Sequence, residues 1–252
     1  MHILGLDIGG TGIKGAPVDT DTGKLLAAVV RKPTPDPATP DAILATAASI
    51  VCEFGWDCPI GCGFPAVVQR GIVRTASNID QRWLNLDVVE RFSERFGRPV
   101  GVINDADAAG LAEMRFGAGR GRDGLVLMLT LGTGIGTALF NDGQLVPNLE
   151  LGQIEVRGKP GHEWAAASVR EEQGLSWEAW AHGLEQVLKT FEAMLWPNLI
   201  IIGGGISADA DQFLPLISLN AKLVPAQLGN EAGIIGAALV GNRESGIGNL
   251  ES

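Results

Sequence analysis

The sequence has no long hydrophobic run. None of its apolar stretches approaches the 18 residues that a membrane-spanning helix needs, so we expect no membrane partner. The N-terminus begins with the apolar residues of an expected strand at 3–6, and a secretory signal is not expected there. These absences predict a cytoplasmic protein.

Cysteine is scarce. Only Cys52, Cys58 and Cys62 occur, their spacing lacks the CxxC pattern, and a fourth metal ligand would have to come from elsewhere. The interpretation that we favour is buried free thiols in a reducing cytoplasm, and a metal site is the alternative.

Positive charge is in deficit. The 19 Lys and Arg residues face 29 Asp and Glu residues, which gives a net charge of −10 and argues against nucleic acid as a partner. An acidic protein that binds a polyanion needs a local basic lining. Charged residues make up only 19% of the 252 residues and hydrophobic ones 46%, which predicts a folded chain with room for two modest domains.

A glycine-rich stretch, residues 7–16, is the strongest local signal. Apolar residues precede and follow it, so we expect a strand, a glycine turn and a second strand. Glycine permits positive φ and leaves backbone N–H groups uncovered, which allows the turn to wrap a phosphate. Lys14 and the Thr11 hydroxyl can add donors, and Asp7 can hold Mg²⁺ through water. The alternative is a tight hairpin without a ligand.

A second copy of the motif occurs later in the chain. Gly10-Thr11-Gly12-Ile13 is repeated identically by Gly132-Thr133-Gly134-Ile135, and the following residues 21–26 and 141–146 are also similar. An internal repeat of strand, glycine turn and strand indicates two copies of one folding unit. Two such loops suit a ligand with several phosphates.

Periodicity and capping residues predict the other elements. We expect a third strand at 25–31, a helix from Pro40 capped by Thr39, and a strand at 60–64 with a hairpin about Arg70-Gly71. We also expect a helix at 86–96 capped by Asn85, a strand at 100–103, and a helix from about residue 105 through 116. Further strands are predicted at 124–130 and 199–202, and further helices after Ser176 and at 231–240.

Several polar residues stand where strands end. Asp105, at a strand-to-helix junction, can act as a general base or can cap the helix, as can Asp107. Asn78 and Glu150 can bind sugar hydroxyls or can be ordinary surface residues. The three glycines at 203–205 allow close approach of a nucleotide or simply turn the chain. Arg115, Arg120 and Arg122 form the best candidate for a cationic surface near the second glycine loop, with a solvated arginine loop as the alternative.

The chain resembles the ROK family of sugar kinases, within the actin–hexokinase superfamily, and more narrowly its branch of bacterial polyphosphate glucokinases. The resemblance runs nearly end to end. It rests on residues 7–15, 74–78, 104–113, 115–119, 129–136, 203–207 and 232–238, of which the run 104–113 is the most specific.

The resemblance implies an α/β fold of two ribonuclease-H-like domains flanking a cleft. The expected domains are residues 1–104 together with about 231–252, a small N-terminal domain to which the last helix returns, and residues 105–230, a larger one. The resemblance also implies phosphoryl transfer from inorganic polyphosphate or ATP to the 6-hydroxyl of glucose, with Mg²⁺, in a homodimer.

The resemblance further implies the site residues. Asp105 would be the catalytic base that deprotonates the sugar, and Asn78, Asn104, Asp105, Glu150 and Gln153 would bind the sugar. The phosphoryl donor would be held by Asp7, Gly9, Gly10, Thr11, Gly12, Lys14, Gly132, Thr133, Gly134, Gly203, Gly204 and Gly205, with Mg²⁺ bound through Asp7.

Three departures from the wider family bear on these expectations. Gln153 stands in place of a histidine, which affects sugar affinity and choice because an amide carries no proton near neutral pH. No cysteine follows Cys62, so no structural zinc is expected. Ala66 stands where the wider family has a glycine in the sugar-side turn.

Two other functions are weighed against the kinase. A DNA-binding regulator would need an N-terminal domain, and Met1 is expected to lie only a few residues from the first strand. A sugar-binding protein with weak or no kinase activity is the second alternative, motivated by Gln153. A kinase for another hexose, such as mannose, is a variant of the main hypothesis.

Overall fold

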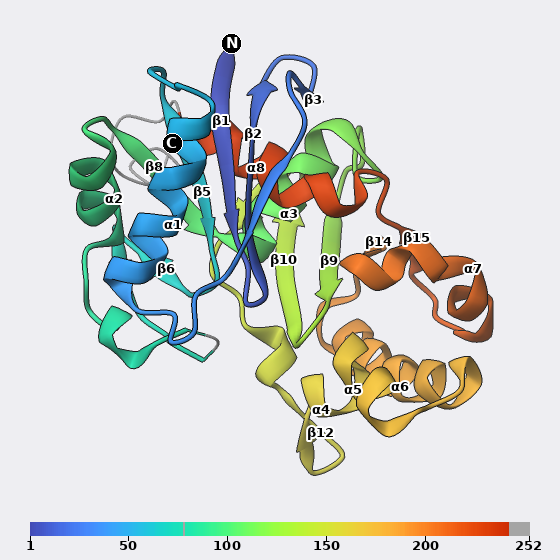
Figure 1. The fold of residues 1–252 in the computed structure, drawn as a ribbon. Coiled ribbons are helices and arrows are strands. Elements are labelled where there is room, and N and C mark those ends of the chain that lie inside the picture. The colour runs from blue at the N-terminus through green and yellow to red at the C-terminus, as the bar shows by residue number, and fades with distance from the viewer. Residues whose placement is uncertain (78, 242–252) are drawn as a thin grey trace. The chain divides into compact units, whose positions relative to one another are not determined.

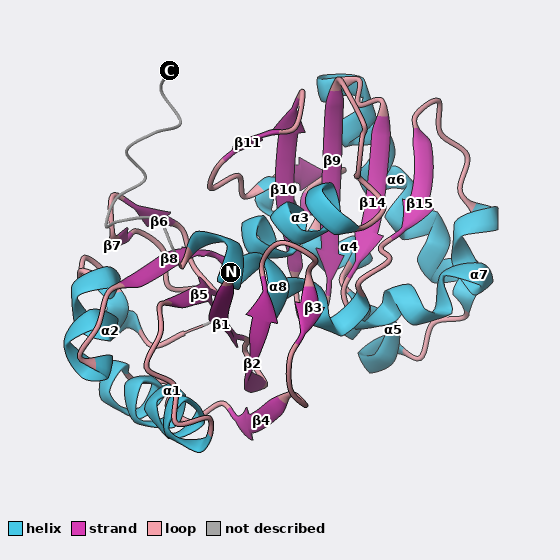
Figure 2. Ribbon diagram, turned by 90° about the horizontal axis from the view of Figure 1, so that it is seen from above, coloured by secondary structure: helices cyan, strands magenta, loops and turns pink. Residues whose placement is uncertain are grey.

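The structure is a computed structural model that describes residues 1–77 and 79–241. The chain divides into two compact units, and the first contains Met1–Ala112 together with the segment that begins at Glu231. The second unit is Glu113–Asn230. The first boundary falls after Ala112, inside a helix, whereas the sequence placed it after residue 104. The α/β fold class is confirmed (Figure 2).

The first unit is built on one sheet with the strand order β3-β2-β1-β5-β8, and β4 also pairs with β2 (Figure 1). Its strands are β1 (His2–Ile8), β2 (Gly12–Asp19), β3 (Lys24–Leu25), β4 (Val30–Pro33), β5 (Ile60–Phe64) and β8 (Val100–Asn104), and β6 (Val68–Gln69) with β7 (Ile72–Val73) forms a separate hairpin. Its helices are α1 (Pro40–Glu53), the short 3-10 helix η1 (Gln81–Trp83), α2 (Val88–Phe96), α3 (Asp105–Phe116), which continues into the second unit, and α8 (Ala232–Val240).

The predicted third strand is wrong as a single element, because β3 and β4 are separate. The backbone N–H of Leu26 still donates to the carbonyl of Pro17 at 2.8 Å. Proline has no N–H with which to return the bond, so the ladder stops there. The chain pairs with β2 again only at Val30, which lies opposite Gly15.

Helix capping follows the sequence at one helix and departs from it at another. Thr39 caps α1 as predicted, since its hydroxyl accepts the N–H of Ala42 at 3.3 Å. The prediction that Asn85 caps the next helix is wrong: Asp87 caps α2 and accepts the N–H of Glu90 at 2.9 Å. Asn85 instead adopts a left-handed conformation with φ of 63° two residues earlier, which is tolerated by asparagine.

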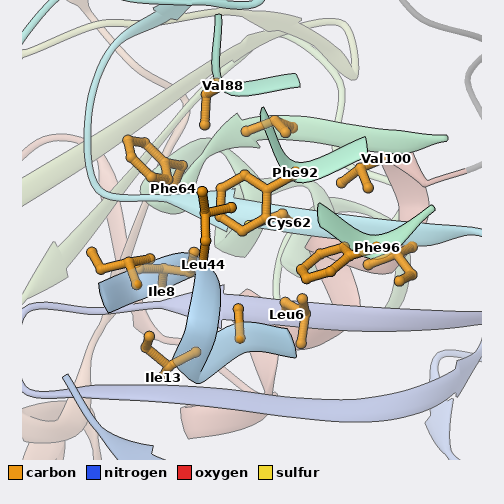
Figure 3. Packing of buried hydrophobic residues seen from close by; sticks show 14 of the residues in the cluster. Leu6, Ile8, Ile13, Leu44, Cys62, Phe64, Val88, Phe92, Phe96 and Val100 are labelled. Carbon is orange, nitrogen blue, oxygen red and sulfur yellow. The ribbon is translucent and has the colours of Figure 1, made fainter. Parts of the chain in front are cut away.

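Alternating apolar residues fix which face of the first sheet is buried under α1 and α2. Leu6, Ile8 and Ile13 point into one cluster with Leu44 and with aromatic side chains, as Figure 3 shows. Phe64, Phe92 and Trp83 form edge and stacked ring contacts with centroids 4.8–6.3 Å apart. Fully buried aromatic rings of this kind each bury a large apolar area and contribute strongly to the energy of the core.

The opposite face of the first sheet carries a row of glycines beneath α8. Gly5, Gly61 and Gly101 lie side by side on β1, β5 and β8. A Cβ at these three positions would lie 2.0, 1.8 and 2.1 Å from the carbonyl oxygens of Ile234, Ala237 and Val240. The helix backbone therefore rests directly on the sheet backbone, and only glycine fits the row.

The second unit repeats the topology of the first. Its sheet has the order β11-β10-β9-β14-β15, with β9–β10 and β10–β11 antiparallel and β9–β14 and β14–β15 parallel. The first sheet has the same directions along β3-β2-β1-β5-β8. The internal repeat predicted from the two glycine motifs is thus confirmed as a duplicated fold.

The elements of the second unit complete the chain. Its strands are β9 (Leu125–Leu131), β10 (Ile135–Asn141), β11 (Gln144–Val146), β14 (Leu199–Gly203) and β15 (Lys222–Pro225), with a hairpin of β12 (Glu155–Val156) and β13 (Lys159–Pro160). Its helices are α4 (His162–Ala165), α5 (Ala167–Gln173), α6 (Trp177–Leu195) and α7 (Ala210–Phe213), with the 3-10 helices η2 (Leu151–Gln153), η3 (Gly205–Asp209) and η4 (Leu214–Leu216), and η5 (Gly229–Glu231) at the boundary.

The long helix α6 covers one face of the second sheet. Ser176 caps it as predicted and accepts the N–H of Ala179 at 3.2 Å. Trp180, Leu184 and Phe191 are fully buried in the core of this unit. Trp177 stacks on Phe213 with centroids 5.8 Å apart, so the tryptophans of this helix are core residues.

A buried carboxylate ties the start of the second unit to its end. Glu113 is fully buried, and its Oε1 accepts the N–H groups of Gln227 and Leu228 at 2.9 and 2.7 Å. Its Oε2 accepts the N–H of Ala118 at 2.8 Å. A Cβ at Gly117 would lie 2.0 Å from Oε2, so glycine is required there. The three N–H donors replace the water that this carboxylate loses on burial.

The expectation of buried thiols holds for one cysteine only. Cys62, on β5, is buried, and desolvation raises the pKa of its thiol well above the ordinary value. Cys52 and Cys58 are exposed, so the prediction is wrong for them. None of the helices within 1–77 and 79–241 combines the length and apolar character needed to cross a bilayer.

Candidate functional site

The first glycine loop connects β1 to β2. The two strands pair as far as Ile8 and Ile13, and the N–H of Gly9 donates to the carbonyl of Gly12 at 3.0 Å. Gly9, Gly10 and Gly12 have no positive φ, so the conformational freedom of glycine is not what the loop uses. A Cβ at Gly10 would meet no protein atom within 4 Å. The bare backbone at Gly10 therefore faces open space.

The second glycine loop is built in the same way, with one residue fewer. Strand pairing ends at Leu131 and Ile135, and the N–H of Gly132 donates to the carbonyl of Gly134 at 3.0 Å. A Cβ at Gly132 or Gly134 would also meet nothing within 4 Å. Neither the fold nor the backbone angles require glycine at these positions, so their natural explanation is a ligand that approaches the loop.

Each loop presents free N–H groups. Within the described part of the chain, the N–H groups of Gly10, Thr11, Thr133 and Gly134 donate to no protein acceptor. Successive N–H groups of this kind form a concave site for an anion such as phosphate.

A hydroxyl from a neighbouring segment holds the backbone of each loop. The Thr34 hydroxyl donates to the carbonyl of Gly9 at 2.6 Å, and the Ser168 hydroxyl donates to the carbonyl of Thr133 at 3.0 Å. The N–H of Ser168 also donates to the carbonyl of Gly132 at 3.1 Å. Sequence reasoning missed Thr34 and Ser168, because neither lies in a motif and only the tertiary fold brings them to the loops.

Asp7 and Lys14 lie opposite each other on β1 and β2, beside the first loop. Lys14 Nζ lies 2.9 Å from Asp7 Oδ2, and both side chains are largely buried. A Cβ at Gly233 would lie 2.7 Å from Asp7 Oδ2, which places the carboxylate against the first turn of α8. The ammonium group of Lys14 and the first turn of α8 therefore both lie beside the Asp7 carboxylate.

The Asp7 carboxylate fits a hydrated metal ion better than a metal ion enclosed by protein ligands. The described residues contain no group of three or more His, Cys, Asp or Glu side chains arranged to hold a metal. Mg²⁺ in phosphoryl-transfer sites is usually held by one or two carboxylates, substrate phosphates and water. The single carboxylate of Asp7 next to an anion-binding loop matches that chemistry.

Asp105 lies at the same edge of the first sheet as the first loop. The strands β1, β5 and β8 are parallel, and Asp7, Gly63 and Ile103 are aligned across them. A Cβ at Gly63 would lie 3.6 Å from the Cα of Asp105. Strands are about 4.8 Å apart, so the start of α3 lies within about 10 Å of the end of β1.

Asn104, not an aspartate, caps α3. Its Oδ1 accepts the N–H groups of Ala106 and Asp107 at 2.9 and 3.1 Å, and its Nδ2 donates to the carbonyl of Ala66 at 3.2 Å. Asp105 Oδ1 accepts the adjacent N–H of Ala106 at 2.9 Å. The cap role that the sequence left open for Asp105 and Asp107 therefore belongs to Asn104, which is itself buried.

The candidate sugar residues of the second unit lie in the short turn before and within η2. Gly152 packs against Ile135, and the Thr137 hydroxyl donates to the carbonyl of Leu149 at 2.7 Å, so the turn is fixed to the start of β10. His162 Nδ1 lies 3.3 Å from the carbonyl oxygen of Gly152. The histidine, which the sequence did not single out, thus braces this turn. Asn78 lies outside the described residues.

Glu150 and Gln153 are both exposed residues of this turn. Although Glu150 is exposed as a whole, partial loss of hydration around its carboxyl group raises its pKa above the ordinary value. Gln153 bonds through its backbone N–H to the carbonyl of Glu150 at 3.0 Å. Their binding to a sugar stays a prediction.

The glycines at the end of β14 and directly after it lie beside the second loop. Gly203 is opposite Thr130 on β9, and a Cβ at Gly204 would lie 2.2 Å from the carbonyl oxygen of Leu131. Gly204 also has a φ of 85°, so the fold itself requires glycine there. Gly205 is different, because a Cβ at this position would meet nothing within 4 Å.

The prediction of a cationic arginine surface near the second loop is wrong for Arg120 and Arg122. Arg120 and Arg122 are exposed just before β9 begins at Leu125, whereas the loop follows the other end of the strand at Leu131. A strand of seven residues is about 20 Å long. The arginine loop and the glycine loop therefore lie at opposite ends of β9.

Each unit thus gathers half of the predicted site at the equivalent edge of its sheet. The first unit brings together Asp7, Lys14, the first loop and Asp105, and the second brings together its own loop, Gly203–205 and the turn at Glu150. That the two loops face one ligand stays a prediction.

Comparison with known proteins gives consistent results. The family model described as "ROK family" matches residues 3–174. A polyphosphate glucokinase of Mycobacterium tuberculosis is 48% identical over 239 residues, which cover 94% of this chain and 90% of the relative.

Two solved structures extend the comparison. The inorganic polyphosphate/ATP-glucomannokinase from Arthrobacter sp. strain KM is 49% identical with a TM-score of 0.92, over 94% of this chain and 97% of that chain. A ROK family glucokinase from Streptomyces griseus, in complex with glucose and AMPPNP, is 26% identical with a TM-score of 0.85, over 97% of this chain and 100% of that chain.

Proposed function

Since the chain belongs to the ROK family, we propose that it is a kinase that transfers a phosphoryl group from inorganic polyphosphate or ATP to the 6-hydroxyl of glucose. The observation that carries the proposal is the pair of glycine loops at matching edges of a duplicated fold, each with free N–H groups and an open glycine face. The similarity to a polyphosphate glucokinase and to a polyphosphate/ATP-glucomannokinase supports the choice of donor and acceptor.

The loops are proposed to hold the phosphates of the donor. Gly10 and Thr11 in the first loop and Thr133 and Gly134 in the second would donate backbone N–H groups, and Lys14 would add positive charge. Gly205 lies close to the second loop, and its open face would admit the nucleoside when ATP is the donor. Asp7 would hold Mg²⁺ through water, and the ion would neutralise charge on the phosphates.

Asp105 is proposed to be the general base. Its carboxylate would take the proton of the sugar 6-hydroxyl as the oxygen attacks the terminal phosphorus. The bond between that phosphorus and the bridging oxygen breaks, and the leaving group is ADP or a polyphosphate shortened by one unit. Asn78, Asn104, Glu150 and Gln153 are proposed to position the sugar, with Asn104 acting also as the cap that orients the first turn of α3.

A four-way assay tests the proposal. The purified full-length protein is given polyphosphate or ATP with glucose or mannose, and formation of the hexose 6-phosphate is followed. We expect turnover of glucose with polyphosphate, and activity on mannose would extend the acceptor range. Binding of glucose without any glucose 6-phosphate from either donor would contradict the kinase and favour a silent sugar-binding protein.

Two further proposals concern the setting of the activity. Three free cysteines are typical of a reducing compartment, which supports the cytoplasm. The resemblance to sugar kinases supports a homodimer, and light scattering on the purified protein would measure its mass in solution.

A further inference from the structure

The strand β4 carries an arginine next to the first glycine loop that belongs to no motif. β4 pairs with β2 so that Arg31 lies directly opposite Lys14, and Lys14 lies directly opposite Asp7 on β1. Directly opposed residues project from the same face of a sheet. Asp7, Lys14 and Arg31 therefore form a row across three strands at the end of the sheet where the loop lies.

The guanidinium of Arg31 lies against the loop itself. A Cβ at Gly12 would be 2.8 Å from Arg31 Nε and 3.3 Å from Nη2. The absence of a side chain at Gly12 is what makes room for the guanidinium. Thus Gly12 differs from Gly10, whose open face meets no protein atom.

The end of β4 is fixed to the loop by hydrogen bonds. The Thr34 hydroxyl donates to the carbonyl of Gly9, and the N–H of Thr34 donates to the carbonyl of Thr11 at 3.4 Å. Together with the pairing of Gly12 and Pro33, these bonds set the position of Arg31 relative to the loop. A guanidinium is a rigid planar fork, so it loses less freedom per hydrogen bond when it binds an anion.

The row has a surplus of positive charge. Lys14 is paired with Asp7 at 2.9 Å, and Lys32 is paired with Glu53. Among residues 1–77 and 79–241, the guanidinium of Arg31 forms no ion pair and no hydrogen bond. Like charges directly opposite on neighbouring strands repel, and an anion bound beside them would relieve that repulsion. A guanidinium presents a planar fork of donors that matches two phosphate oxygens.

We propose that Arg31 binds a phosphate of the donor next to the first glycine loop, and so forms a further subsite for a condensed phosphate chain. This inference rests on the proposed function and names a residue that discriminates between its two donors. A polyphosphate continues past the loops and stays charged along its length, whereas the phosphate chain of ATP ends after three units. Arg31 therefore contributes more to the use of polyphosphate than to the use of ATP.

The test compares Arg31→Gln, Arg31→Lys and the control Arg91→Gln in the full-length protein. Arg91 is exposed on α2 in the same unit, so its replacement removes the same charge away from the loop. For Arg31→Gln we expect the KM for long-chain polyphosphate to rise about tenfold and the KM for ATP to rise less, with an intermediate effect of Arg31→Lys. The slope of log kcat/KM for polyphosphate against log salt concentration should also decrease, by the amount expected for the loss of about one phosphate contact.

Direct binding separates this inference from the proposed function. Titration calorimetry with inorganic tripolyphosphate should show weaker binding to Arg31→Gln than to the unaltered protein and to Arg91→Gln. This comparison tests phosphate binding by Arg31 even if the protein turns over neither donor. In that case the proposed function would fail, and the assignment of Arg31 would still be tested. Equal tripolyphosphate binding and equal polyphosphate KM in Arg31→Gln and Arg91→Gln would overturn the assignment of Arg31.

Discussion

Replacing Gly134 by alanine tests whether the glycine loops exist for a ligand or for the fold. The added Cβ would meet no protein atom within 4 Å, and Gly134 has no positive φ. A Gly→Ala change at such a position stabilises a protein by about 0.4–1 kcal/mol, because it restricts the unfolded chain. The expected free energy of unfolding of Gly134→Ala is therefore unchanged or slightly higher.

The same methyl group would occupy the space through which a phosphate reaches the N–H groups of Thr133 and Gly134. Loss of one hydrogen bond to charge that develops in a transition state typically lowers the rate by about 10²–10³, or about 2.7–4 kcal/mol. We expect kcat/KM for the donor to fall by about a hundredfold. The assay is steady-state kinetics at saturating glucose, with urea unfolding measured on the same preparation.

Gly61→Ala is the control, and we expect it to lower stability because the added methyl group meets the fold instead of a ligand. A Cβ at Gly61 would lie 1.8 Å from the carbonyl oxygen of Ala237, so α8 would have to retreat by about 1.2 Å to reach a tolerable contact of 3.0 Å. Overpacking of this kind lowers the free energy of unfolding by about 1–3 kcal/mol. The upper end of that range is expected, because the clashing atom belongs to the backbone of a packed helix. Normal donor kinetics in Gly134→Ala, or a loss of stability equal to that of Gly61→Ala, would refute the assignment of the loop to a ligand.

Three further outcomes are expected. Asp105→Asn should lower kcat by about 10²–10⁴ while glucose binding, followed by tryptophan fluorescence, changes little, and near-normal turnover would remove Asp105 as the base. Glu113→Gln should lower the free energy of unfolding in urea by about 1–3 kcal/mol, and Glu113→Ala by about 3–5 kcal/mol. The reason is that three backbone N–H donors lose a charged acceptor. An unchanged unfolding midpoint would contradict the structural role of Glu113. The raised pKa of Glu150 means that the folded state binds this proton more tightly than the unfolded state does. The contribution of Glu150 to stability therefore falls as pH rises from 4.5, the ordinary pKa of a glutamate, through the raised pKa. Glucose binding, if it uses the carboxylate, should instead weaken as pH falls through the raised pKa, and the same pH dependence in Glu150→Gln would exclude Glu150 as its source.

The sequence predicted the elements whose signals are local. Identical residues at 10–13 and 132–135 were enough to predict a duplicated unit, and both loops indeed join antiparallel strands of sheets with the same order. Thr39 and Ser176 mark their helices because a hydroxyl before an apolar periodic run satisfies an N–H of the first turn.

The misses have physical causes that are not local. Asn85 and Asp87 are both good capping residues, and the backbone bond between Asn85 N–H and the carbonyl of Val73 decides against the first. The arginine loop was placed near the wrong end of β9 because a strand carries its two flanking loops to opposite edges. Thr34 and Ser168 are ordinary loop residues in the sequence, and only the fold gives them a carbonyl to bind.

The interrupted course of the first unit has a consequence for biosynthesis. Residues 1–112 leave the ribosome early, but the row formed by Gly5, Gly61 and Gly101 packs against the backbone of α8, which is made after residue 231. The second unit is synthesised in between, as one uninterrupted segment, and can fold before the first is complete. Nascent chains that stop short of α8 would therefore expose the glycine face of the first sheet, and chaperones would be needed most during that interval.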